Sequence, residues 1–133
     1  GTYDYHLKPM YWNTTAPRDS FYYVNQWGPA YEADKAIEYI QLQKNKQQPF
    51  ALVVSMNPPH TGYELVPDNY KAIYKDLDVE ALCANRPDIP AKGTTMGDYF
   101  RNNIRNYYAC ITGVDENVGR IIEALKQNNL FDN

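Results

Sequence analysis

A short apolar run that starts at residue 50 constrains the fold of this chain more than any other feature. Residues 50–54 have the sequence Phe-Ala-Leu-Val-Val, which places apolar side chains at both odd and even positions. Because alternate side chains of a strand point to opposite faces, this pattern predicts a strand covered on both faces, as in a parallel sheet packed between helices. Pro58 and Pro59 end the strand, since proline donates no ladder hydrogen bond. We therefore expect an α/β fold.

His60 follows the two prolines directly, on the loop after the predicted strand. Ligands of open α/β sheets bind beyond the carboxyl ends of the strands, so this position favours a role in chemistry. An imidazole there can transfer a proton near neutral pH or, when charged, bind an oxyanion. The alternative is a histidine that only hydrogen-bonds the backbone of its own loop, and the spacing alone leaves both open.

Three helical segments are predicted, one before the strand and two after it. The first starts near Pro29, because proline is favoured at the first helical position, and its alanines and isoleucines recur at spacings of three and four. A short helix is expected near residues 67–75, and irregular chain over residues 76–93. The last helix, about 30 residues long, follows Thr95-Met96-Gly97-Asp98, which resembles a capping box. Its predicted apolar face contains Met96, Phe100, Tyr107, Ile111, Val114, Val118, Ile121 and Leu125.

Residues 1–28 are rich in aromatic and polar side chains and predict an irregular segment packed on the surface. We favour aromatic side chains that pin this segment to the body of the domain over a surface that stacks on sugar rings. His6 lies here, and with Lys8 it would form an anion-binding patch for a substrate, although a structural role is the favoured interpretation. As an alternative fold, residues 20–24 would supply a partner strand in a small α+β domain.

Composition excludes several classes of function. The net charge of −3 and the lack of a basic cluster argue against a nucleic-acid partner, and no apolar run is long enough to span a bilayer. Cys83 and Cys110 match no metal motif, and the sequence leaves open whether they are free or bridged. We expect both to be structural, with Cys83 in a loop. A single strand leaves both its edges unpaired, so the chain is predicted to be an internal fragment of a larger α/β domain.

Three stretches resemble the sulfatase family. Residues 49–67 resemble its strand that ends in Pro-Pro-His, and residues 106–133 resemble its long helix with Tyr-Tyr-Ala, Val-Asp, Val-Gly-Arg-Ile and a final Leu-x-Asp-Asn turn. Residues 27–40 are similar to the helix before the histidine strand. The resemblance implies an arylsulfatase-like, alkaline-phosphatase-like three-layer α/β sandwich. Residues 1–133 would form an internal part of a single catalytic domain.

The resemblance implies a parent enzyme that hydrolyses sulfate esters of small molecules or glycans. In this family a formylglycine hydrate attacks sulfur, and a calcium ion neutralises the sulfate oxygens. His60 matches the family histidine that contacts the sulfate, so a catalytic and substrate-binding role is expected. The Cys/Ser-x-Pro-x-Arg signature and the acidic calcium motifs do not occur in the chain. Formylglycine and the calcium ligands are therefore expected outside it, and these residues alone are expected to be inactive.

Two other functions remain open at this stage. A phosphonate or phosphodiester hydrolase of the same superfamily would share the strand, the long helix and His60. A non-catalytic glycan-binding module would use residues 1–28 and bind sugars without a metal ion. The sequence does not fix the compartment, although family members of this kind are often exported, so a periplasmic or secreted parent fits.

Overall fold

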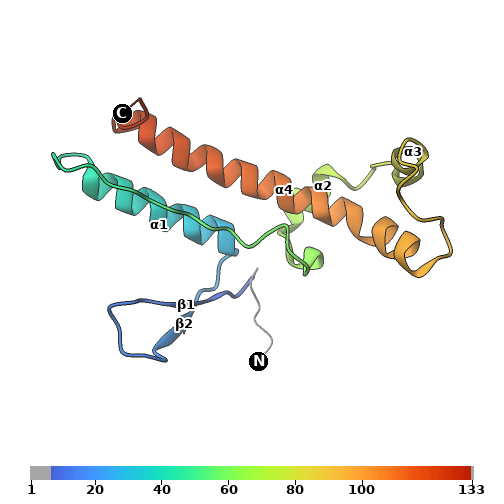
Figure 1. Cartoon of the computed structure of the whole chain (residues 1–133), viewed down its shortest axis with the longest axis horizontal. Coiled ribbons are helices and arrows are strands. Elements are labelled where there is room, and N and C mark those ends of the chain that lie inside the picture. The colour runs from blue at the N-terminus through green and yellow to red at the C-terminus, as the bar shows by residue number, and fades with distance from the viewer. Residues whose placement is uncertain (1–6, 133) are drawn as a thin grey trace.

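The computed structural model describes residues 7–132 as two long helices with shorter elements around them (Figure 1). Helices α1 and α4 run side by side in the same direction, and residues 46–57 return in the opposite direction alongside α1. Within residues 7–132, no helix has both the length and the apolar character needed to cross a bilayer. The elements in chain order are β1 (Met10–Trp12), β2 (Phe21–Tyr23), α1 (Gly28–Gln43), the 3-10 helix η1 (Tyr63–Leu65), α2 (Asp68–Ile73), α3 (Val79–Ala84) and α4 (Thr95–Gln127).

Helix α1 forms where the sequence predicts it. Pro29 occupies its first turn, where the missing N–H costs no helical hydrogen bond. Ala33, Ala36 and Ile40 are buried, and their spacing places them on one face of the helix. These mostly small side chains allow α1 to pack closely against α4.

Helix α4 is capped one residue earlier than the sequence predicts. Thr94 is the N-cap, and its hydroxyl oxygen accepts a hydrogen bond from the N–H of Gly97 at 3.1 Å. Asp98 accepts a hydrogen bond from the N–H of Gly93 at 2.8 Å, so the acid predicted for the capping box supports the preceding turn. The helix has 33 residues, which corresponds to a length of about 50 Å. It ends at Gln127, with Asn128 as the C-cap at the stop that the sequence predicts.

The predicted apolar face of α4 is only partly covered. Met96 is 61% exposed and Val118 is 41% exposed. The covered face lies next to it and consists mostly of small residues, since these allow α1, η1 and α2 to approach the helix backbone. The buried residues of α4 are Gly97, Ile104, Ala109, Cys110, Gly113, Asn117 and Ala124.

The predicted strand at residues 50–54 is wrong for this structure. The segment runs straight alongside α1 (Figure 1), where the ring of Phe50 meets Tyr39 edge-on at a centroid distance of 5.6 Å. No strand within residues 7–132 pairs with it, and Val53 is 90% exposed. A β-strand needs a neighbour for its backbone hydrogen bonds and cover for both faces, and the described residues supply no paired strand and cover only the side toward α1.

Two segments predicted to be irregular contain regular structure. Strands β1 and β2 pair antiparallel, with Met10 opposite Tyr23, so the N-terminal segment forms a hairpin. The alternative strand at residues 20–24 therefore exists, although its partner is β1. The predicted irregular stretch 76–93 contains α3, because Asp78 caps this helix by accepting a hydrogen bond from the N–H of Ala81 at 3.0 Å. This helix includes Cys83, which was predicted to lie in a loop.

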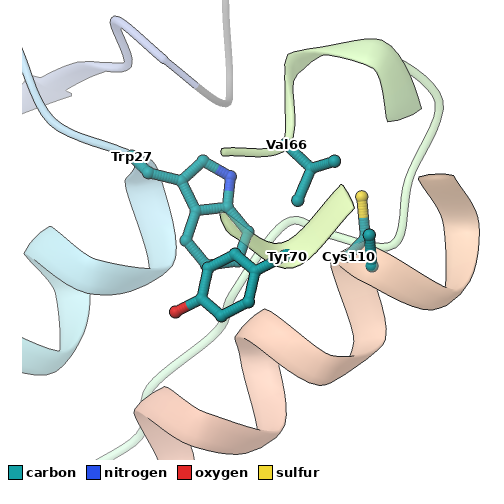
Figure 2. Close-up of a cluster of buried hydrophobic side chains, with 5 residues drawn as sticks. Trp27, Val66, Tyr70 and Cys110 are labelled. Atoms are coloured by element: carbon teal, nitrogen blue, oxygen red, sulfur yellow. The ribbon is translucent and has the colours of Figure 1, made fainter. Parts of the chain in front are cut away.

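A small hydrophobic core joins α1, α2 and α4. It contains Trp27, Val66, Tyr70, Ala109 and Cys110. Figure 2 shows the indole of Trp27, at the start of α1, lying over the ring of Tyr70, with centroids 5.4 Å apart. Val66 and Cys110 close the cluster on the other side. The core therefore fixes the chain just after residue 60 to both long helices.

Candidate functional site

The candidate site is the loop of residues 57–63, which links the segment alongside α1 to η1. The peptide bond between Pro58 and Pro59 is cis. The N–H of His60 donates a hydrogen bond to the carbonyl oxygen of Asn57 at 3.2 Å, which closes a tight turn. Gly62 has a φ of 105°, a left-handed conformation that a residue without Cβ adopts readily, and it leads into η1. The loop thus has a defined shape.

His60 is exposed within this loop. Its Nδ1 lies 3.1 Å from the hydroxyl oxygen of Thr61, a distance at which the two atoms hydrogen-bond. This contact orients the imidazole ring and leaves the exposed ring edge able to reach a ligand. The sequence predicts His60 on the loop after a strand; the structure has it on a loop, but the segment before that loop is not a strand within residues 7–132, and the chemical role of His60 remains a prediction.

The loop is held in place by the residues that follow it. The ring of Tyr63 meets Tyr107 of α4 nearly perpendicularly, with centroids 5.7 Å apart. Val66 is 1% exposed and belongs to the core with Cys110. Burial raises the pKa of the Cys110 thiol to about 11, so this side chain behaves as an apolar core residue at neutral pH. The residues that follow the histidine loop therefore pack against the middle of α4.

The sequence offers one further candidate for substrate binding, His6. His6 lies outside the described residues. Cys83 and Cys110 are both free, on α3 and α4. Within residues 7–132, no three His, Cys, Asp or Glu side chains are grouped so that they could hold a metal ion. The described part of the chain does not fit a calcium cage by itself.

The sequence did not reveal a pocket beside the loop. This pocket of about 530 Å³ is lined by Tyr63, by α4 residues including Tyr99 and Tyr107, and by residues 86–90. A larger apolar groove of about 960 Å³ lies between α1, residues 46–58 and the C-terminal half of α4. The high tyrosine content is the only sequence signal for the pocket, since its residues come from three separated segments.

The chain was compared with known families, proteins and structures. A family model described as Sulfatase matches residues 5–133. An endo-4-O-sulfatase from Bacteroides thetaiotaomicron is 34% identical over 139 residues, and the match covers 100% of this chain and 26% of that protein. The chain thus spans about a quarter of that relative's length.

Two solved structures have a similar fold. A crystal structure of a Bacteroides fragilis protein, assigned as the sulfatase yidJ, matches with 91% sequence identity and a TM-score of 0.95. The match covers 100% of this chain and 29% of the Bacteroides fragilis chain. A structure from work on glycosaminoglycan metabolism by Bacteroides thetaiotaomicron is 32% identical with a TM-score of 0.79, and covers 98% of this chain and 26% of that one. These matches confirm the predicted fold class, an α/β fragment with a long C-terminal helix.

Proposed function

Because the chain belongs to the sulfatase family, we propose that residues 1–133 form an internal part of one catalytic domain that hydrolyses sulfuric esters. Within that domain, His60 faces the sulfate group of the substrate. The observation that carries this proposal is the position of His60. It is exposed on a shaped loop, at the end of a segment that runs opposite to the two long helices. In the larger domain residues 50–56 would form a strand, and ligands of α/β domains bind at the carboxyl ends of strands.

Uncovered apolar surface supports a larger domain around these residues. The groove between α1 and α4 is lined by Ile40, Val54, Val114 and Ile121, among other residues. Val53, on the same segment, is 90% exposed. Contiguous exposed apolar surface of this kind is typical of a face that packs against other structure. Further strands of a larger domain would cover this groove and would pair with residues 50–56.

Buried polar atoms without partners support the same conclusion. Within residues 7–132, Trp27 Nε1, Glu32 Oε2 and Asn57 Nδ2 are buried and have no hydrogen-bond partner. Buried polar groups in native proteins are nearly always paired, so partners from the rest of the domain are expected here. Asn57 starts the histidine loop, which places one of these expected contacts at the proposed site.

His60 has two roles in the proposed reaction. In the charged form, its ring N–H donates a hydrogen bond to a sulfate oxygen and stabilises the negative charge. As a general acid, it gives the same proton to the ester oxygen as the bond from that oxygen to sulfur breaks and an oxygen nucleophile from outside this chain bonds to sulfur; the alcohol leaves neutral and the imidazole is left neutral. The exposed edge of the ring serves both roles, because the opposite edge is oriented by Thr61.

Calcium and formylglycine belong to this proposal only as expectations from the family. The described residues offer no group of three metal-binding side chains, and the chain lacks the family's nucleophile signature. When bound, a calcium ion would neutralise sulfate charge. Its ligands and the formylglycine are expected in other parts of a longer protein, so we derive no step of the reaction from them.

We infer a sulfated glycan as the substrate. One relative is named as an endo-4-O-sulfatase, and one similar structure comes from work on glycosaminoglycan metabolism. A 4-O-sulfated glycosaminoglycan tetrasaccharide is therefore the appropriate probe, and a small aryl sulfate is the appropriate minimal substrate.

The test is sulfate release by the longer protein that contains this chain. His60→Ala should lower kcat for both substrates by roughly 10²- to 10⁴-fold, the usual contribution of a general acid. The thermal stability of the His60→Ala protein should not change, because the His60 side chain is exposed. Asn45→Ala, in the exposed turn after α1, is the control and should keep full activity. Equal activity of the His60 and Asn45 variants would refute the proposed role. Turnover of a phosphodiester in place of the sulfate ester would favour the phosphodiesterase alternative.

A further inference from the structure

The tyrosine-lined pocket beside the histidine loop has the composition of a ligand site. It has a volume of about 530 Å³ and lies between η1, the N-terminal half of α4 and residues 86–90. Ligand pockets are mostly apolar and aromatic, with a few polar groups that fix orientation. The large groove along α1 differs, because its lining is mainly aliphatic and suits protein packing. The aromatic lining of the pocket consists of Tyr63, Tyr99, Phe100, Tyr107 and Tyr108.

The tyrosine rings are fixed against one another. Tyr63 and Tyr107 meet edge to face at 81°, with centroids 5.7 Å apart, and Tyr107 and Tyr108 lie 6.1 Å apart. Burial raises the pKa of Tyr63, and the neighbouring Tyr99 raises it further. The Tyr63 phenol therefore remains neutral at neutral pH and keeps its O–H donor. Rings with an apolar face and a polar edge match a pyranose, which has a C–H face and a rim of hydroxyls.

Polar side chains stand at the rim of the pocket. Arg86 donates to Asp88 from Nε at 3.0 Å and from Nη2 at 2.9 Å. This pair uses two of the five N–H donors of the guanidinium and holds its plane in a fixed orientation. The remaining donors suit a sugar hydroxyl, a carboxylate or a second sulfate. Asn103 lines the same pocket.

The pocket lies close to His60 along the chain. Tyr63 lines the pocket and follows His60 by three residues, so their Cα atoms are at most about 11 Å apart. A pyranose ring is built from single bonds about as long as those of the backbone, so it spans roughly half that distance. A sugar next to the one that carries the sulfate can therefore reach the tyrosines while the sulfate meets His60.

We propose that this pocket, with Tyr99 and Arg86 at its rim, is a subsite that binds the sugar adjacent to the sulfated one. The proposal rests on the proposed function, because it takes the sulfate to lie at His60. Tyr99 stacks on the sugar ring, and Arg86 donates hydrogen bonds to its polar substituents. The subsite thus contacts a glycan chain but makes no contact with a small aryl sulfate.

The experiment uses the longer protein and the 4-O-sulfated tetrasaccharide named above. Tyr99→Ala should raise KM for the tetrasaccharide about tenfold, the usual effect of losing one aromatic contact, with kcat/KM for the aryl sulfate unchanged. Tyr99 is 46% exposed, so its loss should leave the fold intact. The matched control is Tyr23→Ala, a 65% exposed tyrosine on the N-terminal hairpin, which should have no effect. Arg86→Ala should act like Tyr99→Ala.

A binding measurement separates failure of the subsite from failure of the catalytic proposal. Calorimetric titration of the His60→Ala protein with the tetrasaccharide requires no turnover, and adding Tyr99→Ala should weaken Kd about tenfold. Absence of turnover by the unsubstituted protein, together with tetrasaccharide binding that Tyr99→Ala weakens, would refute the proposed function and support the subsite. Three results would overturn the subsite. The first is an unchanged Kd for the tetrasaccharide after Tyr99→Ala. The second is a loss of kcat/KM for the aryl sulfate equal to the loss for the tetrasaccharide. The third is weaker tetrasaccharide binding by Tyr23→Ala in place of Tyr99→Ala, which would assign the glycan to the hairpin.

Discussion

Gly113 of α4 lies directly against the indole of Trp27, and no side chain fits between them. A Cβ at position 113 would lie 2.8 Å from Cζ3 of Trp27, closer still to its Cη2, and 3.0 Å from Cε2 of Tyr70. Because these ring atoms belong to the buried core, they cannot move aside without loosening the anchor of the histidine loop.

Gly113→Ala should therefore destabilise the protein by about 1–3 kcal/mol, the usual cost of overpacking a core. The control is Gly119→Ala on the same helix, where an added Cβ meets nothing within 4 Å. That variant should be neutral or up to about 1 kcal/mol more stable, because alanine is the better helix former. Urea unfolding of both variants measures the difference, and equal stabilities would contradict the packing described.

Thr94→Ala should lower stability by about 1 kcal/mol, because it removes the hydroxyl that accepts from Gly97 at the start of α4. The neighbouring Thr95→Ala should have little effect, since Thr95 lies inside the helix. Thermal melts of the two variants would decide which threonine is the cap. A larger loss for Thr95→Ala would place the cap where the sequence alone predicts it.

Arg120→Ala should cost roughly 0.2–1 kcal/mol at pH 7, since it removes an exposed ion pair between Arg120 of α4 and Asp34 of α1. Burial tends to raise the pKa of Asp34, but hydrogen bonds from Gln26 and Arg120 outweigh it and lower the pKa. Because the pKa is lowered on folding, the Asp34 carboxylate stabilises the fold at pH values above the pKa that it has in the unfolded state. That stability is lost as pH falls below about 4 and Asp34 is protonated.

The difference in free energy of unfolding between Arg120→Ala and the unsubstituted protein should therefore become smaller at low pH. Urea midpoints at pH 7 and pH 3 measure it. Lys46→Ala is the control, because Lys46 is exposed in the turn after α1 and, within residues 7–132, forms no ion pair with α4; its small effect should be the same at both pH values. A difference that stays constant between the two pH values would show that the ion pair does not link the helices.

Cys110 should react with iodoacetamide much more slowly than Cys83. Burial of Cys110 raises its pKa to about 11, which leaves little thiolate at pH 8, whereas Cys83 is only half-buried. Mass spectrometry of peptides after timed alkylation should show at least a tenfold difference in rate, since the thiolate is the reactive form. Similar rates at both sites would contradict the core around Trp27.

The helices could be predicted where a signal extended over many residues. Helix α4 keeps its period for 33 residues, and Pro29 marks the start of α1. Helix α3 has only six residues, too few to show a period, although Asp78 followed by a helix-forming stretch was a usable cap signal. Strand β2 could be predicted only as an alternative, and β1 was not predicted, because the tyrosines of the hairpin do not alternate with polar residues.

The run at residues 50–54 shows the limit of a local pattern. Its apolar residues indicate burial on two faces, but burial depends on neighbours that the described residues do not include. The position of His60 could be predicted, because two prolines and an apolar run mark the loop locally. The pocket beside it could not, since Tyr63, Arg86 and Tyr99 meet only after α4 and residues 86–90 have folded together.

A crystal structure of the longer protein with a sulfated glycan bound tests the central claim most directly. The account predicts that a ring nitrogen of His60 lies within hydrogen-bonding distance, about 2.7–3.2 Å, of a sulfate oxygen or of the ester oxygen. It also predicts that residues 50–56 pair with strands supplied by the rest of the domain. A sulfate bound elsewhere, with His60 pointing into solvent, would contradict the account.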